Sequence, residues 1–151
     1  MELEDVFRAH QQAVFAYFLR VVGNRQDAEE LTQETFVRAC SAALRFRGDS
    51  SVTTWLFGIA RRVLLEASRA GLFERSPELH EVASTGEDVE ARMDLERALA
   101  SLAVIDREAL VMVDMLGFEP IDAAGVIGVT PEAMRVRLHR ARGRLREAYG
   151  R

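Results

Sequence analysis

Apolar residues recur at helical spacing in two stretches of this 151-residue chain, and a segment without periodicity separates them. The stretches cover residues 1–70 and 89–151, whereas residues 71–88 mix Gly, Pro and Ser with acids in no regular order. Nowhere does the alternation of apolar and polar residues that marks a half-buried strand persist. We therefore predict an all-α fold of two small helical domains joined by a flexible, acidic linker.

The N-terminal stretch predicts three helices. Apolar spacing indicates a first helix over residues 3–22 and a second over about 27–44, with Asp27 placed to cap the second. Residues 46–51 concentrate Gly, Asp and Ser, which favours a loop. A third helix is predicted over residues 52–70, so the first domain is a three-helix unit.

The C-terminal stretch predicts about four helices, with breaks at Gly117 and Gly128. Glycine at 128 permits a positive φ, while Thr130 can cap the helix that follows and Pro131 suits its first turn. A short helix, a tight turn and a second helix at this spacing are typical of a DNA-binding helix-turn-helix. The last helix carries an apolar stripe for packing, formed by Met134, Leu138, Ala141 and Leu145.

The opposite face of that last helix is predicted to bind DNA. If it enters the major groove, Arg135 and Arg140 can donate to guanine edges or phosphates, and Val136 can touch a thymine methyl group. Arginines on the flanks suit backbone phosphates, whose contacts position a helix without reading sequence. The predicted DNA contacts are Thr130, Glu132, Arg135, Val136, Arg137, His139, Arg140 and Arg142, with Arg144 and Arg146 as further phosphate ligands.

Charge is segregated along the chain, although the net charge is only −4. Residues 135–151 contain seven Arg and one acid, whereas residues 71–134 contain four Arg and 14 acids. The basic end is a candidate phosphate-binding surface, and the acidic middle would keep non-specific DNA binding low. A nucleic-acid partner is therefore compatible with the acidic total.

No targeting or membrane segment is predicted. The N-terminus is acidic where a secretory signal would be basic, and no apolar run approaches the ~18 residues that a membrane span needs. We expect a soluble, cytoplasmic protein with no additional domain after Arg151.

Catalytic and metal-binding patterns are absent from the sequence. The lone Cys40 cannot form an intrachain disulfide and is expected to be a packed thiol. His10, His80 and His139 lack metal-ligand spacing with each other or with Cys40. No nucleophile, base and orienting group converge, and no glycine loop could cradle a phosphate. We therefore expect no catalytic residue, no metal and no cofactor.

Three blocks of the chain resemble one known family, the extracytoplasmic-function (ECF) sigma factors. Two segments of the chain resemble region two of that family almost position for position: DAEELTQETFVR at 27–38 and FRGDSSVTTWLFGIARR at 46–62. Region four is similar to VTPEAMRVRLHRAR at 129–142. The blocks stand in the family's order, and the resemblance covers nearly the whole chain except the linker. It implies an alternative sigma factor that binds RNA polymerase core and directs promoter-specific initiation.

The resemblance also implies which helix meets the polymerase. In the family, the second helix docks on the clamp helices of the β′ subunit, and the β flap is a further implied partner. The implied polar contacts are Asp27, Glu30, Gln33 and Glu34. From the residues themselves, Glu30, Gln33 and Glu34 share one helix face, which offers acceptors to a basic partner surface.

Promoter contacts follow from the same resemblance. The loop at 46–51 and the third helix would capture the non-template strand of the −10 element, since unstacked bases need polar or aromatic partners. Trp55 is either an anchor of the core, the reading we favour, or a stacking platform for the strand. Arg62 stands where the family usually has Asn, so the preferred −10 sequence does not carry over. The implied −10 contacts are Phe46, Arg47, Gly48, Asp49, Ser50, Trp55, Arg61 and Arg62, and the helix-turn-helix would read the −35 element.

Two other functions stay open at this point. A stand-alone helix-turn-helix regulator would bind its operator tightly without polymerase, usually as a dimer. A decoy that sequesters an anti-sigma factor would bind that partner without starting transcription. For the sigma factor itself, the linker would let both domains reach the promoter, and an anti-sigma factor is an implied partner that would clamp them together.

Overall fold

The computed structural model describes residues 2–74 and 86–149, and every regular element within them is helical. In chain order the elements are α1 (Leu3–Val22), α2 (Arg25–Ala42), η1 (Ala43–Arg45), α3 (Val52–Arg69), η2 (Leu72–Glu74), α4 (Gly86–Ala100), α5 (Val104–Leu110), η3 (Val111–Met115), α6 (Pro120–Ile127) and α7 (Pro131–Tyr149). Short 3-10 turns form η1 and η2, and η3 is a π-helical continuation of α5. The predicted all-α class is confirmed.

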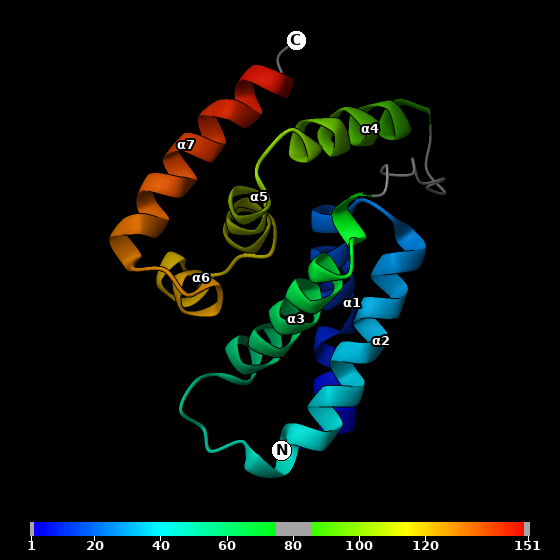
Figure 1. Ribbon diagram of the computed structural model, residues 1–151, viewed down its shortest axis with the longest axis vertical. Coiled ribbons are helices and arrows are strands. Elements are labelled where there is room, and N and C mark those ends of the chain that lie inside the picture. Colours follow the sequence, from blue (N-terminus) through cyan, green and yellow to red (C-terminus); the bar gives the residue numbers. More distant parts are fainter. Residues whose placement is uncertain (1, 75–85, 150–151) are drawn as a thin grey trace.

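Two helical units lie side by side in Figure 1, with α1, α2 and α3 at the lower right and α4 to α7 above them and to their left. The predicted three helices followed by about four are therefore present. Most of the expected linker, residues 75–85, lies outside the described residues. The turn η2 and the start of α4 occupy the two ends of the range 71–88, so its flexibility and the domain boundaries stay predictions.

The start of α2 corrects one expectation. The helix begins at Arg25, and its cap is Asn24, whose Oδ1 accepts a hydrogen bond from the backbone N–H of Asp27 at 2.9 Å. Asp27 is thus the third residue of the helix, and the prediction that it caps α2 was wrong. Asn and Asp cap helices about equally well, so residue type does not decide whether Asn24 or Asp27 caps α2. Gly23 ends α1 at a φ of 80°, and Asn24 follows it directly, so α2 starts there.

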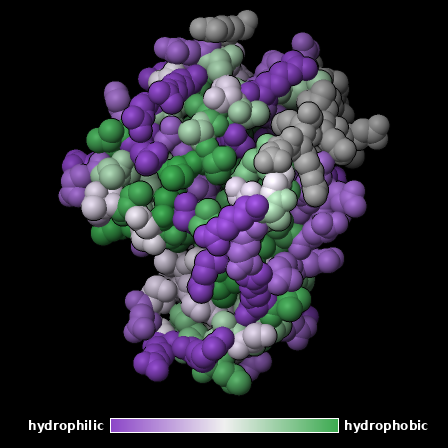
Figure 2. All heavy atoms as spheres, in the orientation of Figure 1, coloured by the Kyte–Doolittle hydropathy of each residue, from purple (hydrophilic) through white to green (hydrophobic). Residues whose placement is uncertain are grey.

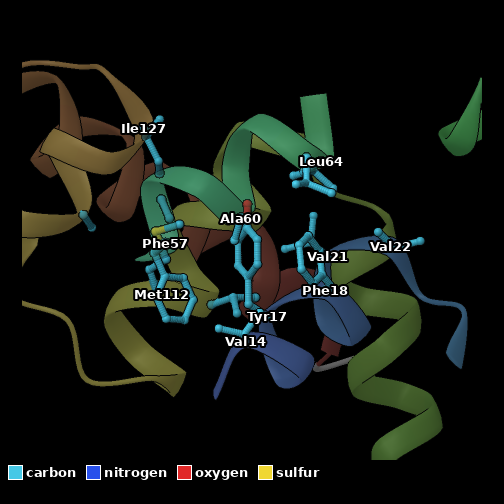
Figure 3. Close-up of a cluster of buried hydrophobic side chains, with 14 of the residues drawn as sticks. Val14, Tyr17, Phe18, Val21, Val22, Phe57, Ala60, Leu64, Met112 and Ile127 are labelled. Carbon is cyan, nitrogen blue, oxygen red and sulfur yellow. The ribbon is translucent and has the colours of Figure 1, made fainter. Parts of the chain in front are cut away.

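A single hydrophobic core runs through both units (Figure 3). Tyr17 of α1 and Phe57 of α3 are fully buried, and their rings meet edge to face at 5.6 Å. From the second unit, Met112 and Ile127 point toward Phe57. Phe118, just before α6, also meets Phe57 edge to face, with centroids 4.9 Å apart. The two predicted domains are therefore packed against each other.

The surface of α2 corrects a second expectation. Cys40 is exposed, so the prediction of a packed thiol was wrong. Phe36 and Ala39, close to Cys40 on α2, face the core, whereas Val37 is 60% exposed. An α-helix has 3.6 residues per turn, so residues 36–40 cover more than one full turn and cannot all face the core.

Hydrophilic residues cover much of the face drawn in Figure 2, with hydrophobic residues gathered over α5 and α6. Of the helices that the structure describes, none is long and apolar enough to cross a membrane. Residues 2–74 and 86–149 also contain no group of three side chains placed to hold a metal ion.

Candidate functional site

The outer face of α2 presents three of the four residues predicted to meet a protein partner. Glu30, Gln33 and Glu34 are exposed and lie on one side of the helix. Asp27 is instead buried in the first turn, at 7% exposure, where a carboxylate is favoured by the N-terminal end of the helix. The exposed acceptors thus form a narrower surface than the sequence indicated.

Arg38 connects this acidic face to α3. Its Nε donates to Glu34 Oε1 at 2.9 Å, and its Nη2 donates to Glu66 of α3. The hydrogen bond from Arg38 lowers the pKa of the Glu66 carboxyl below its usual value. Sequence reasoning missed this bridge, because Arg38 and Glu66 are 28 residues apart.

The loop before α3 is open, and its Phe46 pairs with an aromatic residue of α3. Arg47, Asp49 and Ser50 are exposed, and Gly48 has a φ of +77° that other residues rarely adopt. Phe46 packs on Trp55 with ring centroids 5.1 Å apart. The indole is half-buried and contacts the core, which fits the favoured reading of Trp55 as an anchor.

A hollow beside this loop lies between α2 and α3 and is rich in arginine. It is lined by Val37, Arg38, Ser41, Ala42, Arg45, Trp55, Ile59 and Arg62. Arg62 is exposed, and its Nε donates to the carbonyl of Gly58 at 3.3 Å. Arg38 is already paired with Glu34 and Glu66, but Arg45 and Arg62 beside the indole can hold a base by stacking and its phosphate by charge.

Arg61 does not join this hollow. Its Nε donates to Oε1 of Glu108 at 3.1 Å, and its Nη2 donates to Oε2 at 3.4 Å. Glu108 belongs to α5 and is fully buried, and the hydroxyl of Tyr17 donates to its Oε1 at 2.8 Å. Burial raises the pKa of the Glu108 carboxyl, although Arg61 acts in the opposite direction. The structure thus separates Arg61 from Arg62 and places it between the two units.

The helix-turn-helix is confirmed in its predicted place. Gly128 ends α6 at φ 85°, and its N–H donates to the carbonyl of Ala124 at 2.8 Å. Thr130 caps α7, because its Oγ1 accepts from the N–H of Ala133 at 3.1 Å. Buried residues on the inner side of α7 are Met134, Leu138 and Ala141.

The outer face of α7 is open. The predicted contacts that lie exposed on it or at its start are Thr130, Glu132, Arg135, Val136, His139, Arg140 and Arg142. Arg137 is tied inward, with its Nη1 3.1 Å from Oδ1 of the buried Asp106. Arg142 forms two hydrogen bonds with Asp114, and these hold its guanidinium against η3. Seven of the eight predicted residues are therefore exposed, and two of the eight, Arg137 and Arg142, have acidic partners that the sequence did not reveal.

Comparison with known proteins identifies the two units. The family model Sigma-70 region 2 matches residues 6–71, and the model Sigma-70, region 4 matches residues 92–145. The ECF RNA polymerase sigma factor SigC of Mycobacterium tuberculosis is 36% identical over 152 residues, which cover 95% of this chain and 80% of SigC. The chain belongs to the ECF sigma factors. SigM of M. tuberculosis, an ECF sigma factor, is 31% identical over 97% of this chain and 76% of its own length.

This ECF sigma factor also resembles relatives of known structure across both regions. The sigma factor RpoE in complex with the anti-sigma factor NepR from Bartonella quintana superposes with a TM-score of 0.84 at 25% identity, covering 96% of this chain and 94% of RpoE. CnrH in complex with the cytosolic domain of CnrY gives a TM-score of 0.70 at 25% identity over 95% of this chain and 84% of CnrH. Because the RpoE superposition spans both units, region two and region four are packed in a similar arrangement in the two proteins.

In the ECF sigma factor, α1–α3 form region two and α4–α7 form region four. Sigma factors are transcription initiation factors, and the predicted alternative sigma factor is confirmed. The residues that sequence reasoning missed are the buried acids Asp106 and Glu108 of α5. A signal was present, since both stand within a short helix that is otherwise largely apolar.

Proposed function

We propose that this ECF sigma factor uses three separate surfaces to bring RNA polymerase core to a promoter. The exposed side of α2 would meet the β′ clamp helices, the loop and hollow of region two would hold the −10 strand, and α7 would read the −35 duplex. The observation that carries this proposal is that α2 and α7 each leave one polar face exposed in the part of the chain that the structure describes. Such a protein needs no catalytic residue and would work in the cytoplasm.

The α2 surface is supported by its charge and shape. Glu30, Gln33 and Glu34 offer acceptors on one exposed side, which complements a basic helical partner. Asp27 would act on this surface indirectly, because it is buried at the start of the same helix. Exposed charged residues such as these on α2 mainly raise the rate and specificity of docking with the partner.

The residues proposed to contact the −10 strand differ in how accessible they are in this structure. Arg62 and Trp55 line the hollow beside Phe46, and Arg47, Gly48, Asp49 and Ser50 leave their loop open to a flipped base. Arg61 would join them only after it leaves Glu108.

The −35 proposal places Arg135, Val136, His139 and Arg140 in the major groove. All four are exposed along two turns of α7, and Thr130 and Glu132 stand at its N-terminal end. Arg137 and Arg142 would reach phosphates from the edges by exchanging their carboxylate partners for DNA. The basic face suits DNA, and its surrounding acids would limit non-specific binding.

An anti-sigma factor is the proposed regulatory partner. RpoE and CnrH, whose structures this chain resembles across both regions, are each found in complex with another protein, and NepR is an anti-sigma factor. The β flap is proposed as the further polymerase contact, for region four.

Transcription with purified core polymerase tests the function. Adding the chain should convert weak, unspecific synthesis into defined run-off products on host DNA fragments. Replacing Glu30, Gln33 and Glu34 together by Ala should lower core affinity, whereas Glu147→Ala, which removes an exposed acid at the far end of α7, should not. Unchanged products with the full chain, or tight operator binding without core, would overturn the proposal.

A further inference from the structure

A polar contact between the two regions is centred on Glu108. The carboxylate comes from α5 of region four, and both of its donors come from region two: Tyr17 of α1 at 2.8 Å and Arg61 of α3 at 3.1 Å. Tyr17 and Glu108 are fully buried, and the Arg61 side chain is 14% exposed. Both donors reach the same oxygen, Oε1, so one acceptor atom joins three helices.

This contact exists only while the regions are packed together. A buried carboxylate or phenol without a partner is strongly disfavoured, so the contact selects one relative placement of the regions. The apolar pair Phe57 and Phe118 supports the same placement. Arg107 adds a hydrogen bond from α5 to the carbonyl of Val21 in α1. The closed arrangement is thus specified by this chain's own residues.

We infer that Glu108 is a latch that keeps region two closed on region four and withholds Arg61 from promoter DNA until core polymerase separates the regions. The inference rests on the proposed function, because it assigns Arg61 to the −10 strand. The outer face of α7 and the acceptors of α2 stay exposed in the closed form, so core and the −35 duplex can still dock. Opening would then be coupled to assembly with polymerase.

The latch can be broken without touching the proposed binding surfaces. Tyr17→Phe removes one donor and leaves a buried carboxylate less well paired, while Glu108→Ala removes the acceptor altogether. Glu108→Gln keeps an oxygen for both donors and should keep the latch shut. Glu90→Gln makes the same change on an exposed position of α4 and serves as the control.

Pulsed electron–electron resonance between spin labels on Cys40 and on a Tyr149→Cys variant measures opening in the full chain. Both positions are exposed, and they lie on α2 and α7. Because the two labels lie near opposite ends of the closed molecule (Figure 1), we expect one defined distance in the otherwise unchanged chain and in Glu108→Gln and Glu90→Gln, and a different distance once core is added. In Tyr17→Phe the fraction of molecules at the distance seen with core should rise about three- to tenfold without core, as expected for loss of one buried hydrogen bond.

Two further measurements separate the possible failures. Circular dichroism checks that Tyr17→Phe and Glu108→Ala keep their helices, and Tyr17→Phe is the decisive variant if Glu108→Ala unfolds. A distance that core does not change, or that is the same in Tyr17→Phe and in the unchanged chain without core, overturns the latch. Run-off transcription is measured in parallel: specific products with an unchanged distance refute the latch alone, whereas absence of specific products refutes the proposed function.

Discussion

Arg142 and Asp114 form a bidentate ion pair between α7 and η3. Nε of Arg142 donates to Oδ2 of Asp114 at 2.9 Å, and Nη2 donates to Oδ1 at 2.7 Å. This pairing raises the pKa of the Arg142 guanidinium and fixes its direction. Arg137 has a similar partner in the buried Asp106. Two arginines predicted to bind phosphates therefore also hold α7 on the helices before it.

The first prediction separates these two roles of Arg142. If Arg142 binds a phosphate, Arg142→Ala should lower −35 affinity and reduce the slope of log K against log salt by about 0.9. Asp114→Asn should leave that slope unchanged or strengthen binding, because it frees the guanidinium. Filter binding or fluorescence anisotropy at several salt concentrations measures both. Equal slopes in the two variants would mean that Arg142 only supports the fold, and each change should then cost at most about 1 kcal/mol of stability.

The second prediction concerns the turn of the helix-turn-helix. Gly128 has a φ of +85° and open space where a Cβ atom would lie, so Gly128→Ala is penalised by backbone strain alone, by about 1 to 2 kcal/mol. Gly125 lies inside α6 with equally open surroundings, and Gly125→Ala should stabilise the protein by up to about 1 kcal/mol. Urea unfolding of the pair gives opposite signs if the turn geometry is correct. Two variants of the same sign would contradict it.

Local signals explain why the sequence predicted region four well. Gly128, Thr130 and Pro131 act on their immediate neighbours, and the structure places each in its predicted role. The stripe that begins with Met134 follows from helical periodicity alone. Open positions such as Arg135 could be recognised in the same way, because they lie opposite that stripe.

Longer-range contacts explain what the sequence could not predict. Arg61 and Arg62 are neighbours in nearly the same local context, yet Arg61 meets Glu108, which is 47 residues away. Helical periodicity places Arg61 on the side of the buried Phe57 and Leu64, but it does not reveal Glu108 as the partner, since that depends on how region four packs. Cys40 was wrongly predicted to be packed for a simpler reason. It directly follows the buried Ala39, and a step of one residue along the helix turns its side chain toward solvent.

The third prediction tests the corrected start of α2. Asn24→Ala should cost about 1 kcal/mol of stability, because the N–H of Asp27 loses its acceptor. Asn24→Asp retains an acceptor at the same position and should cost much less. Thermal unfolding followed by circular dichroism compares the two with the unchanged chain. A helix capped by Asp27 instead would leave both variants as stable as the original.

The fourth prediction uses the protonation of Glu108. Desolvation raises the pKa of this carboxyl in the folded chain above its unfolded value of about 4.3, and Arg61, Tyr17 and Arg107 only partly oppose the shift. A raised carboxyl pKa contributes stability that is present below about pH 4.3 and is lost as pH rises through the folded value. The unchanged chain should therefore lose stability relative to Glu108→Gln across that window, by up to about 1.4 kcal/mol per pH unit.

Urea unfolding of the unchanged chain and Glu108→Gln from pH 4 to pH 8 measures this difference. Most other groups cancel between the two proteins, including Glu66, whose lowered pKa makes its stabilisation disappear only as pH falls below the usual carboxyl range. A difference that grows with pH and then levels off locates the folded pKa of Glu108. A difference that is constant from pH 4 to pH 8 would show that Arg61 and Tyr17 fully compensate the burial of the carboxylate, which contradicts the direction of the shift.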